Sequence, residues 1–272
     1  YLSCGNPADQ VNLEVRAINY NLLGRRNYLN LKAEAKEDVL QTFVSWANNK
    51  ERLFKADLMA KAQFQAEEDE AGKRFLHTHV DLQPSELVFN DSVWRVSPAT
   101  IDVQQGQVAS QNFRVAHDQQ YAYIRGTVSP DPSDTLFLDL NQIELAYIFD
   151  IIGNPVLQFA GKATGKFNLV DLYNSRIMNT DLEVQDFSFN RVNLGRLSLF
   201  SEWDNEEQGI LMLGSIYQND STWSDVNGYI YPVGPQAGLS LHFDAKEVDV
   251  AFINPFVEKV IKNLKGRGTG QV

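Results

Sequence analysis

The sequence has 272 residues, of which 43% are hydrophobic and 22% charged, and its formal net charge at pH 7 is −11. This length supplies one large domain or two modest ones with a sizeable core, and the composition excludes a wholly disordered chain. An acidic chain with only short basic runs lacks the positive stripe that nucleic acids require, so we expect no nucleic-acid partner.

Cysteine content and hydrophobicity exclude two further classes of protein. Cys4 is the only cysteine, which excludes an internal disulfide framework and a thiolate metal cluster. The longest apolar run, Leu145–Gly153, is interrupted by Asp150 and is too short to cross a bilayer. Because the chain begins with Tyr1 rather than Met, we expect it to be an internal piece of a longer protein whose anchor or targeting segment lies elsewhere.

The first 75 residues predict a less regular β region. Glu51–Gln65 has the alanine and lysine content of a helix, but its apolar residues alternate as in a strand, and we predict a strand. The acidic run Glu67–Glu70 is typical of a solvated hairpin tip. His77 and His79 share one face of the next predicted strand. A zinc site needs further ligands, so we interpret both as exposed or half-buried strand histidines.

From Leu136 onward most of the chain alternates apolar and polar residues, which predicts strands with one apolar face. Turn-forming clusters separate these runs, as expected for a mainly antiparallel meander. Helical spacing near residues 143–152 and 254–264 predicts two short helices. Ten alternating residues should face a common interior: Leu136, Leu138, Leu140, Leu182, Val184, Leu197, Leu199, Leu239, Leu241 and Phe243.

The sequence also repeats itself at an offset of 105 residues. Leu136–Asp139 matches Leu241–Asp244, and Gly161–Gly165 matches Gly266–Gly270. We therefore predict two tandem β units, 76–166 and 167–272, preceded by the leading region 1–75. Tandem units of this kind extend a sheet along one axis, because each contacts mainly its neighbours.

The segment Gly161–Lys166 superficially resembles a phosphate-binding loop. That loop has four residues between its glycines and a Ser or Thr after the lysine, whereas here three residues intervene and Phe167 follows. We interpret this segment and its counterpart Gly266–Gly270 as tight turns between repeats. Since no other catalytic motif is present, we predict no enzymatic activity, no catalytic residues, no metal site and no cofactor.

Two stretches carry a resemblance to a known family. Asp139–Ile148, followed by a short helix and Gly161–Phe167, resembles the AsmA/TamB-like superfamily of cell-envelope proteins. Asn90–Trp94 with Pro98–Ile101 looks especially like the large TamB-type members of Bacteroidetes. The resemblance covers residues 75–272 well and the first 75 loosely. It implies an elongated, twisted antiparallel sheet of tandem repeats, curled into a taco-like groove with short helices.

The resemblance also implies a function and a location. Such proteins are anchored in the inner membrane, extend across the periplasm, and serve phospholipid transport between membranes or outer-membrane protein assembly. The ten apolar residues would then line a groove for phospholipid acyl chains, and assembly partners would bind parts of the parent protein outside this chain.

The alternative is a β-sandwich-like module that binds glycan or protein partners at the cell envelope. Its candidate binding residues are the aromatics Trp203, Trp223, Tyr229 and Tyr231. A sandwich closes two apolar faces on each other, whereas a conduit leaves one open, and the alternation of residues is the same in both.

Overall fold

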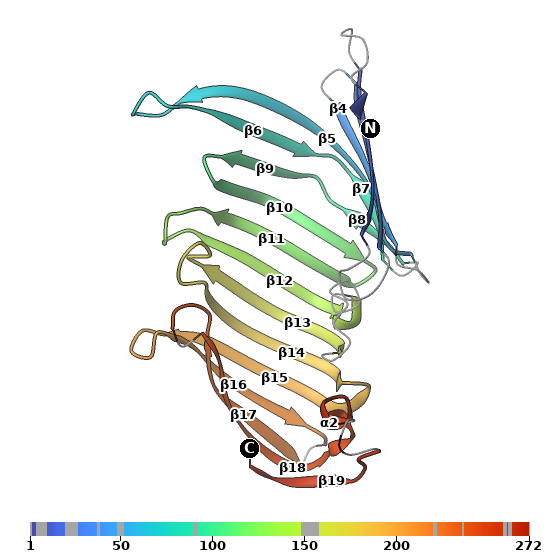
Figure 1. Cartoon of the computed structure of the whole chain (residues 1–272), viewed down its shortest axis with the longest axis vertical. Helices are drawn as coiled ribbons and strands as arrows, with labels where there is room; N and C mark the ends of the chain where they lie inside the picture. Colours follow the sequence, from blue (N-terminus) through green and yellow to red (C-terminus); the bar gives the residue numbers. More distant parts are fainter. Residues whose placement is uncertain are drawn as a thin grey trace. The chain divides into compact units, whose positions relative to one another are not determined.

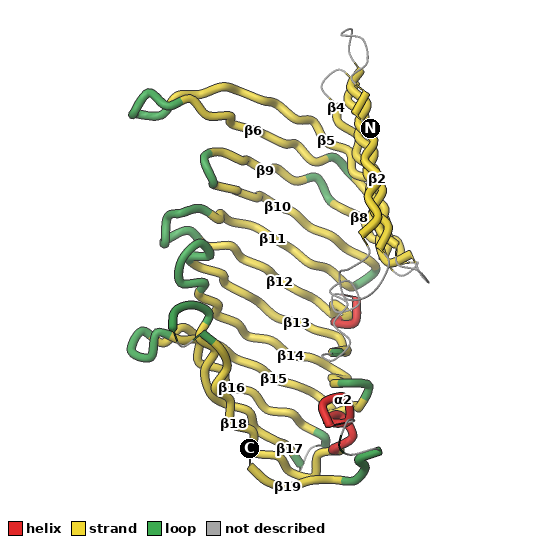
Figure 2. The backbone as a smooth tube through the Cα atoms, viewed as in Figure 1, coloured by secondary structure: helices red, strands yellow, loops and turns green. Residues whose placement is uncertain are grey.

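A computed structural model describes residues 2–3, 10–19, 27–36, 39–47, 52–89, 92–147, 158–219, 222–235, 237–257, 260 and 263–271. More than half of the chain lies in β-strands, as Figure 2 shows, which confirms the mainly β fold class with short helices. Contacts between residues divide the chain into two compact units, Tyr1–Ser129 and Pro130–Val272. The repeat boundaries expected from the sequence stay a prediction.

The first unit consists of short and long β-strands. Its strands are β1 (Leu2–Ser3), β2 (Gln10–Asn19), β3 (Asn27–Lys36), β4 (Val39–Ala47), β5 (Arg52–Glu68), β6 (Arg74–Leu82), β7 (Ser85–Phe89), β8 (Ser92–Val96), β9 (Ala99–Gln104), β10 (Gln107–His117) and β11 (Gln120–Val128). The ambiguous segment Glu51–Gln65 thus lies almost wholly in β5, and the strand prediction is confirmed. The acidic run that follows reaches the turn between β5 and β6, as predicted.

Two continuous strands, β5 and β10, enclose two interrupted rows of strands in the first unit (Figure 1). β5 pairs with β6 through its C-terminal half and with β7 through its N-terminal half. β9 and β8 pair in turn with β6 and β7 on one side and with β10 on the other. The meander β1–β4 precedes β5, and β11 follows β10.

Proline accounts for the interruptions. Pro84 separates β6 from β7, and Pro98 separates β8 from β9. Proline has no backbone N–H to donate to a neighbouring strand, so a regular ladder stops there. Local hydrogen bonds compensate: the Gln83 amide donates to the Met59 carbonyl at 2.7 Å, and the Met59 amide donates to Ser85 Oγ at 2.9 Å.

The second unit is an antiparallel meander in which each strand pairs with the next along the chain (Figure 1). Its strands are β12 (Thr135–Glu144), β13 (Phe159–Val170), β14 (Ile177–Phe189), β15 (Val192–Asp204), β16 (Gly209–Tyr217), β17 (Trp223–Tyr231), β18 (Gly238–Asp249) and β19 (Arg267–Gln271). The predicted meander is confirmed here.

A bulge recurs in this meander at the offset found in the sequence. Gln142 in β12 and Glu247 in β18 both have φ of 51°, a left-handed conformation that marks an extra residue in the ladder. The amide of Gln142 donates to Thr164 Oγ1 at 2.9 Å, and the amide of Glu247 donates to Thr269 Oγ1 at 3.0 Å. The two segments therefore share a local conformation as well as a sequence.

The interpretation of the glycine segments as tight turns is wrong. Gly161–Lys166 lies inside β13, and most of Gly266–Gly270 lies in β19. Gly161 and Gly266 do have positive φ, 123° and 124°, but at a bulge and at a strand start. Glycine has no Cβ and therefore adopts positive φ in bulges and at strand starts as well as in turns. The sequence alone does not distinguish these cases.

Helical structure occurs at both predicted places (Figure 2). Near the first, Ile143 and Glu144 still belong to β12, Leu145–Tyr147 are helical, and residues 148–152 lie outside the described residues. At the second, a 3₁₀ helix, η1 (Val250–Ile253), leads into α2 (Asn254–Val257). Asp249 caps η1 by accepting the Ala251 amide at 2.9 Å.

The core of the second unit lies beside the line of bulges. Six buried residues form it, namely Ala163, Val184, Phe187, Leu194, Ile216 and Val248. Phe252 of η1 and Phe189 of β14 pack against this cluster, with ring centroids 5.7 Å apart. The helical segment therefore covers one end of the sheet's apolar face.

Candidate functional site

The strand register places the sequence-predicted apolar residues on one face of the second unit's sheet. Directly paired residues of antiparallel strands share a face. One row across the strands runs through Leu140, Gly165, Leu182, Leu199, Gly214, Val226 and Phe243, and the next through Leu138, Phe167, Thr180, Ser201, Met212, Gly228 and Leu241. We call this side of β12–β18 the apolar face.

The remaining candidates fit the same pattern. Leu136 pairs with Leu169 two positions from Leu138, and Val184 pairs with Leu197 two positions from Leu182. The backbone of Leu239 pairs with Ile230, while its side chain lies outside the described residues. The structure thus brings nine described side chains together on one face, although the groove that they would line stays a prediction.

The opposite face is largely polar. Lys166 pairs with Asp139 on one side and with Asp181 on the other, so charged residues follow one another across three strands. An exposed apolar pair, Phe200 and Leu213, interrupts this surface. The alternation of the strands therefore separates a mainly apolar side from a mainly polar side.

Burial changes along the apolar face. At the end covered by η1, Val184 has no exposed area and Ile216 is 7% exposed. Farther from the bulges, Leu138, Leu182 and Leu199 are only half-buried, and Leu241 is 44% exposed. The apolar face is therefore filled beside the bulges, whereas exposure beyond them is uneven: Leu241 is exposed, but Thr180, Ser201 and Ile210 are buried.

Glycine lets the strands of this face approach closely. A Cβ at Gly165 would lie 2.3 Å from the Asp181 carbonyl oxygen and 3.0 Å from Leu182 Cδ1. A Cβ at Gly214 would lie 2.7 Å from Val226 Cγ1. The neighbouring leucine and valine side chains thus fill the space above the glycines.

The aromatic residues of the alternative function do not form a single surface. Trp203 pairs with Ile210 and lies on the apolar face. Tyr229 and Tyr231 stack on the opposite face with centroids 5.9 Å apart. Trp223 lies at the other end of the same strand, where Lys246 Nζ is 5.0 Å from its ring. A glycan platform that uses all four is therefore not assembled.

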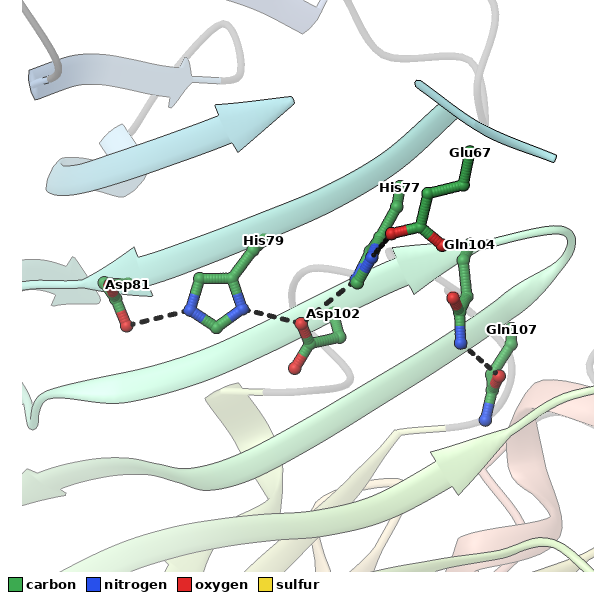
Figure 3. A network of polar contacts seen from close by, with 7 residues as sticks. All are labelled: Glu67, His77, His79, Asp81, Asp102, Gln104 and Gln107. Carbon is green, nitrogen blue, oxygen red and sulfur yellow. Dashed lines mark hydrogen bonds and ion pairs between the residues drawn. The ribbon is translucent and has the colours of Figure 1, made fainter. Parts of the chain in front are cut away.

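A second cluster of polar residues lies in the first unit (Figure 3). His77 Nδ1 lies 2.9 Å from Glu67 Oε1, and its Nε2 lies 3.4 Å from Asp102 Oδ1. His79 Nδ1 lies 2.6 Å from the same Asp102 oxygen, and its Nε2 lies 3.4 Å from Asp81 Oδ1. Each imidazole therefore lies between two carboxylates, and we call these five residues the histidine cluster.

The carboxylates shift the titration of this cluster. The hydrogen bond with Glu67 raises the pKa of His77, and the hydrogen bond with Asp102 raises the pKa of His79. The pKa of Asp102 is lowered, mainly by its hydrogen bond with His79. Each charged form is stabilised by its opposite-charge neighbour.

The histidines are half-buried strand residues, as predicted, with 27% and 35% of their side chains exposed. The sequence did not reveal Asp102 as their partner, because it is 23 positions from His79 and reaches it only through the pairing of β6 with β9. Across the part of the chain that the structure describes, no group of three His, Cys, Asp or Glu is arranged to hold a metal ion. No described helix is long and apolar enough to cross a membrane.

No family model, curated protein or solved structure matches this chain.

Proposed function

We propose that the apolar face of β12–β18 binds phospholipid acyl chains, and that the chain is a non-enzymatic segment of a cell-envelope protein that moves lipid between membranes. The observation that carries this proposal is the alignment of the predicted residues on one face that is only partly filled. Leu241 is 44% exposed there, with half-buried Leu138 in the same row.

The energetics of lipid transfer favour such a surface. Each CH₂ group exposed to water costs about 0.8 kcal/mol, so the two chains of a phospholipid cost on the order of 20 kcal/mol or more in water. A surface made mainly of Leu, Val, Met and Phe side chains, with Thr180 and Ser201 among them, replaces water around the chains. Because it offers few polar partners, it holds them without binding one lipid too tightly to move.

The exposure of part of the apolar face favours this proposal over a closed sandwich. In a sandwich the inner residues of one sheet are covered by the other sheet. Here Val184 is covered, and in the row through Leu138 and Leu241 the residues Thr180 and Ser201 are buried, but Leu138 is half-buried and Leu241 is exposed. This accessibility supports a lipid-binding face over an ordinary core.

The proposed setting is the periplasm, with the parent protein anchored in the inner membrane. The support for this setting is the sequence resemblance to the AsmA/TamB-like superfamily. Outer-membrane protein assembly is the second role that this resemblance suggests, and its partners would bind parts of the parent protein beyond this chain.

Photo-crosslinking in cells that produce the parent protein tests the proposal. A photoreactive amino acid at Leu138 or Leu241 should capture phospholipid, which mass spectrometry of the crosslinked protein identifies. The matched controls are the neighbouring positions Asp139 and Ser240, which face the opposite side and should capture none. Equal labelling on both faces, or none on the apolar face, would refute acyl-chain binding.

A further inference from the structure

The histidine cluster lies on a seam between two hairpins of the first unit. β5 and β6 form one hairpin, and β9 and β10 form the other. β6 meets β9 through five residue pairs, from Thr78 with Val103 to Leu82 with Ala99. Both described ion pairs of His77 and His79 with Asp102 cross this seam (Figure 3).

The protonation state decides how many of these contacts are hydrogen bonds. A neutral imidazole carries one N–H, so it can donate to only one carboxylate, whereas an imidazolium carries two. Both nitrogens of His77 face carboxylates, as do both nitrogens of His79. Only the doubly protonated rings satisfy all four contacts.

The balance of charge around the seam favours the same state. On this face β5 contributes Glu67 and Lys61, and Lys61 lies opposite Asp81 in the strand register. β6 contributes Asp81 and the two histidines, and β9 contributes Asp102. The β10 residues that face them, Gln107, Ala109 and Gln111, are uncharged. Three carboxylates therefore surround two imidazoles, with one lysine at the edge of the group.

We propose that His77, His79 and Asp102 form a proton-operated clasp that holds β6 on β9 more firmly in mildly acidic than in alkaline solution. The clasp is independent of acyl-chain binding, because it lies in the first unit and on a polar face. It makes the strength of one seam in the sheet depend on the pH of the compartment.

The direction of the pKa shifts gives the pH window. The pKa values of both histidines are raised, so their contribution is fully present below about pH 6.5, the unfolded value, and is lost as the pH rises through the folded values. The pKa of Asp102 is lowered, so its contribution persists until the pH falls through that lower value. The seam is therefore firmest in mildly acidic solution.

Hydrogen exchange of the whole chain tests the clasp. Protection factors of β6 and β9 amides, corrected for intrinsic exchange, should fall roughly two- to tenfold from about pH 5.5 to about pH 8, the range of one or two half-exposed ion pairs. The double variant His77→Gln/His79→Gln should lose this difference. His242→Gln, an exposed position on β18 in the second unit, is the matched control and should keep it.

An NMR titration of the imidazoles provides the second readout. Both histidines should titrate above about pH 6.5 in the native chain, and Asp102→Asn should lower both values. The proposal is overturned if the protection factors of the β6 and β9 amides are the same at both pH values, or if the double variant keeps their difference. It is also overturned if Asp102→Asn leaves the pKa values of both histidines unchanged. The titration of the native chain needs no variant, so it still tests the proposal if a variant fails to fold.

Discussion

Replacing Gly165 by alanine should destabilise the second unit, whereas the same change at the repeat-equivalent Gly270 should not. A Cβ at Gly165 would lie 2.3 Å from the Asp181 carbonyl oxygen and 2.8 Å from Leu182 Cα. Around Gly270 nothing lies within 4 Å of the corresponding position. The two glycines occupy matching sequence positions, but Gly165 lies in β13, which pairs with β12 on one side and β14 on the other, whereas the described pairing of Gly270 is with β18.

The size of the effect follows from the clash. Ordinary contact of a Cβ begins at 3.4 Å, so β13 and β14 must separate by roughly 1 Å, which is comparable to overpacking a core and costs about 1–3 kcal/mol. Weakened ladder hydrogen bonds add about 1 kcal/mol, and the stiffer unfolded chain returns about 0.4–1 kcal/mol. The expected net loss for Gly165→Ala is therefore about 1–4 kcal/mol, with a middle value of about 2 kcal/mol.

Urea unfolding followed by circular dichroism measures this loss. With a slope of about 2 kcal/mol per molar urea, the midpoint of Gly165→Ala should fall by roughly 1 M, while that of Gly270→Ala should stay within about 0.25 M of the native value. Equal midpoints for Gly165→Ala and the native chain would show that the strands adjust freely. Equal losses at both glycines would show that neighbouring backbone is not the cause.

Two further predictions concern hydrogen bonds of the same unit. Thr164→Val and Thr269→Val each remove the acceptor of a bulge amide and should each lower the free energy of unfolding by about 1 kcal/mol in urea titrations; an unchanged midpoint in both would contradict the role given to the hydroxyls. Hydrogen bonds from the Ser175 amide and from Asn174 lower the pKa of Asp171, so its contribution exists above about pH 4 and is lost as the pH falls through the lowered value. Asp171→Asn should therefore be less stable near neutral pH and lose less stability on acidification, and parallel pH profiles of the two proteins would argue against this.

Local patterns were sufficient to predict the strands and much of the apolar face. The alternation of Leu136, Leu138 and Leu140 is a property of neighbouring residues, so it is read directly from the sequence. The 105-residue offset also aligns Gln142 with Glu247, and the two residues share a conformation. Both signals lie within short segments or in direct comparison of segments.

Features that depend on which strands become neighbours were not predictable in this way. β6 pairs with β9 rather than with the strands that directly follow it, because Pro84 and Pro98 interrupt both rows. His79 and Asp102 meet only through that pairing. The bulge at Asp186, with φ of 52°, also shifts the alternation so that Val184 and Phe187 both enter the core. A strict period of two misses that change.

The breaks between β6 and β7 and between β8 and β9 form one line across the sheet of the first unit. The break at Pro84 and the break at Pro98 lie side by side, since Leu82 pairs with Ala99 on one side of them and Ser85 pairs with Val96 on the other. β5 and β10 cross this line without interruption and join the two parts. Bending along such a line disturbs few regular ladder hydrogen bonds, because each proline lacks an N–H and the Gln83 and Met59 amides bond across the break instead. The sheet can therefore change its curvature along the line that Pro84 and Pro98 define.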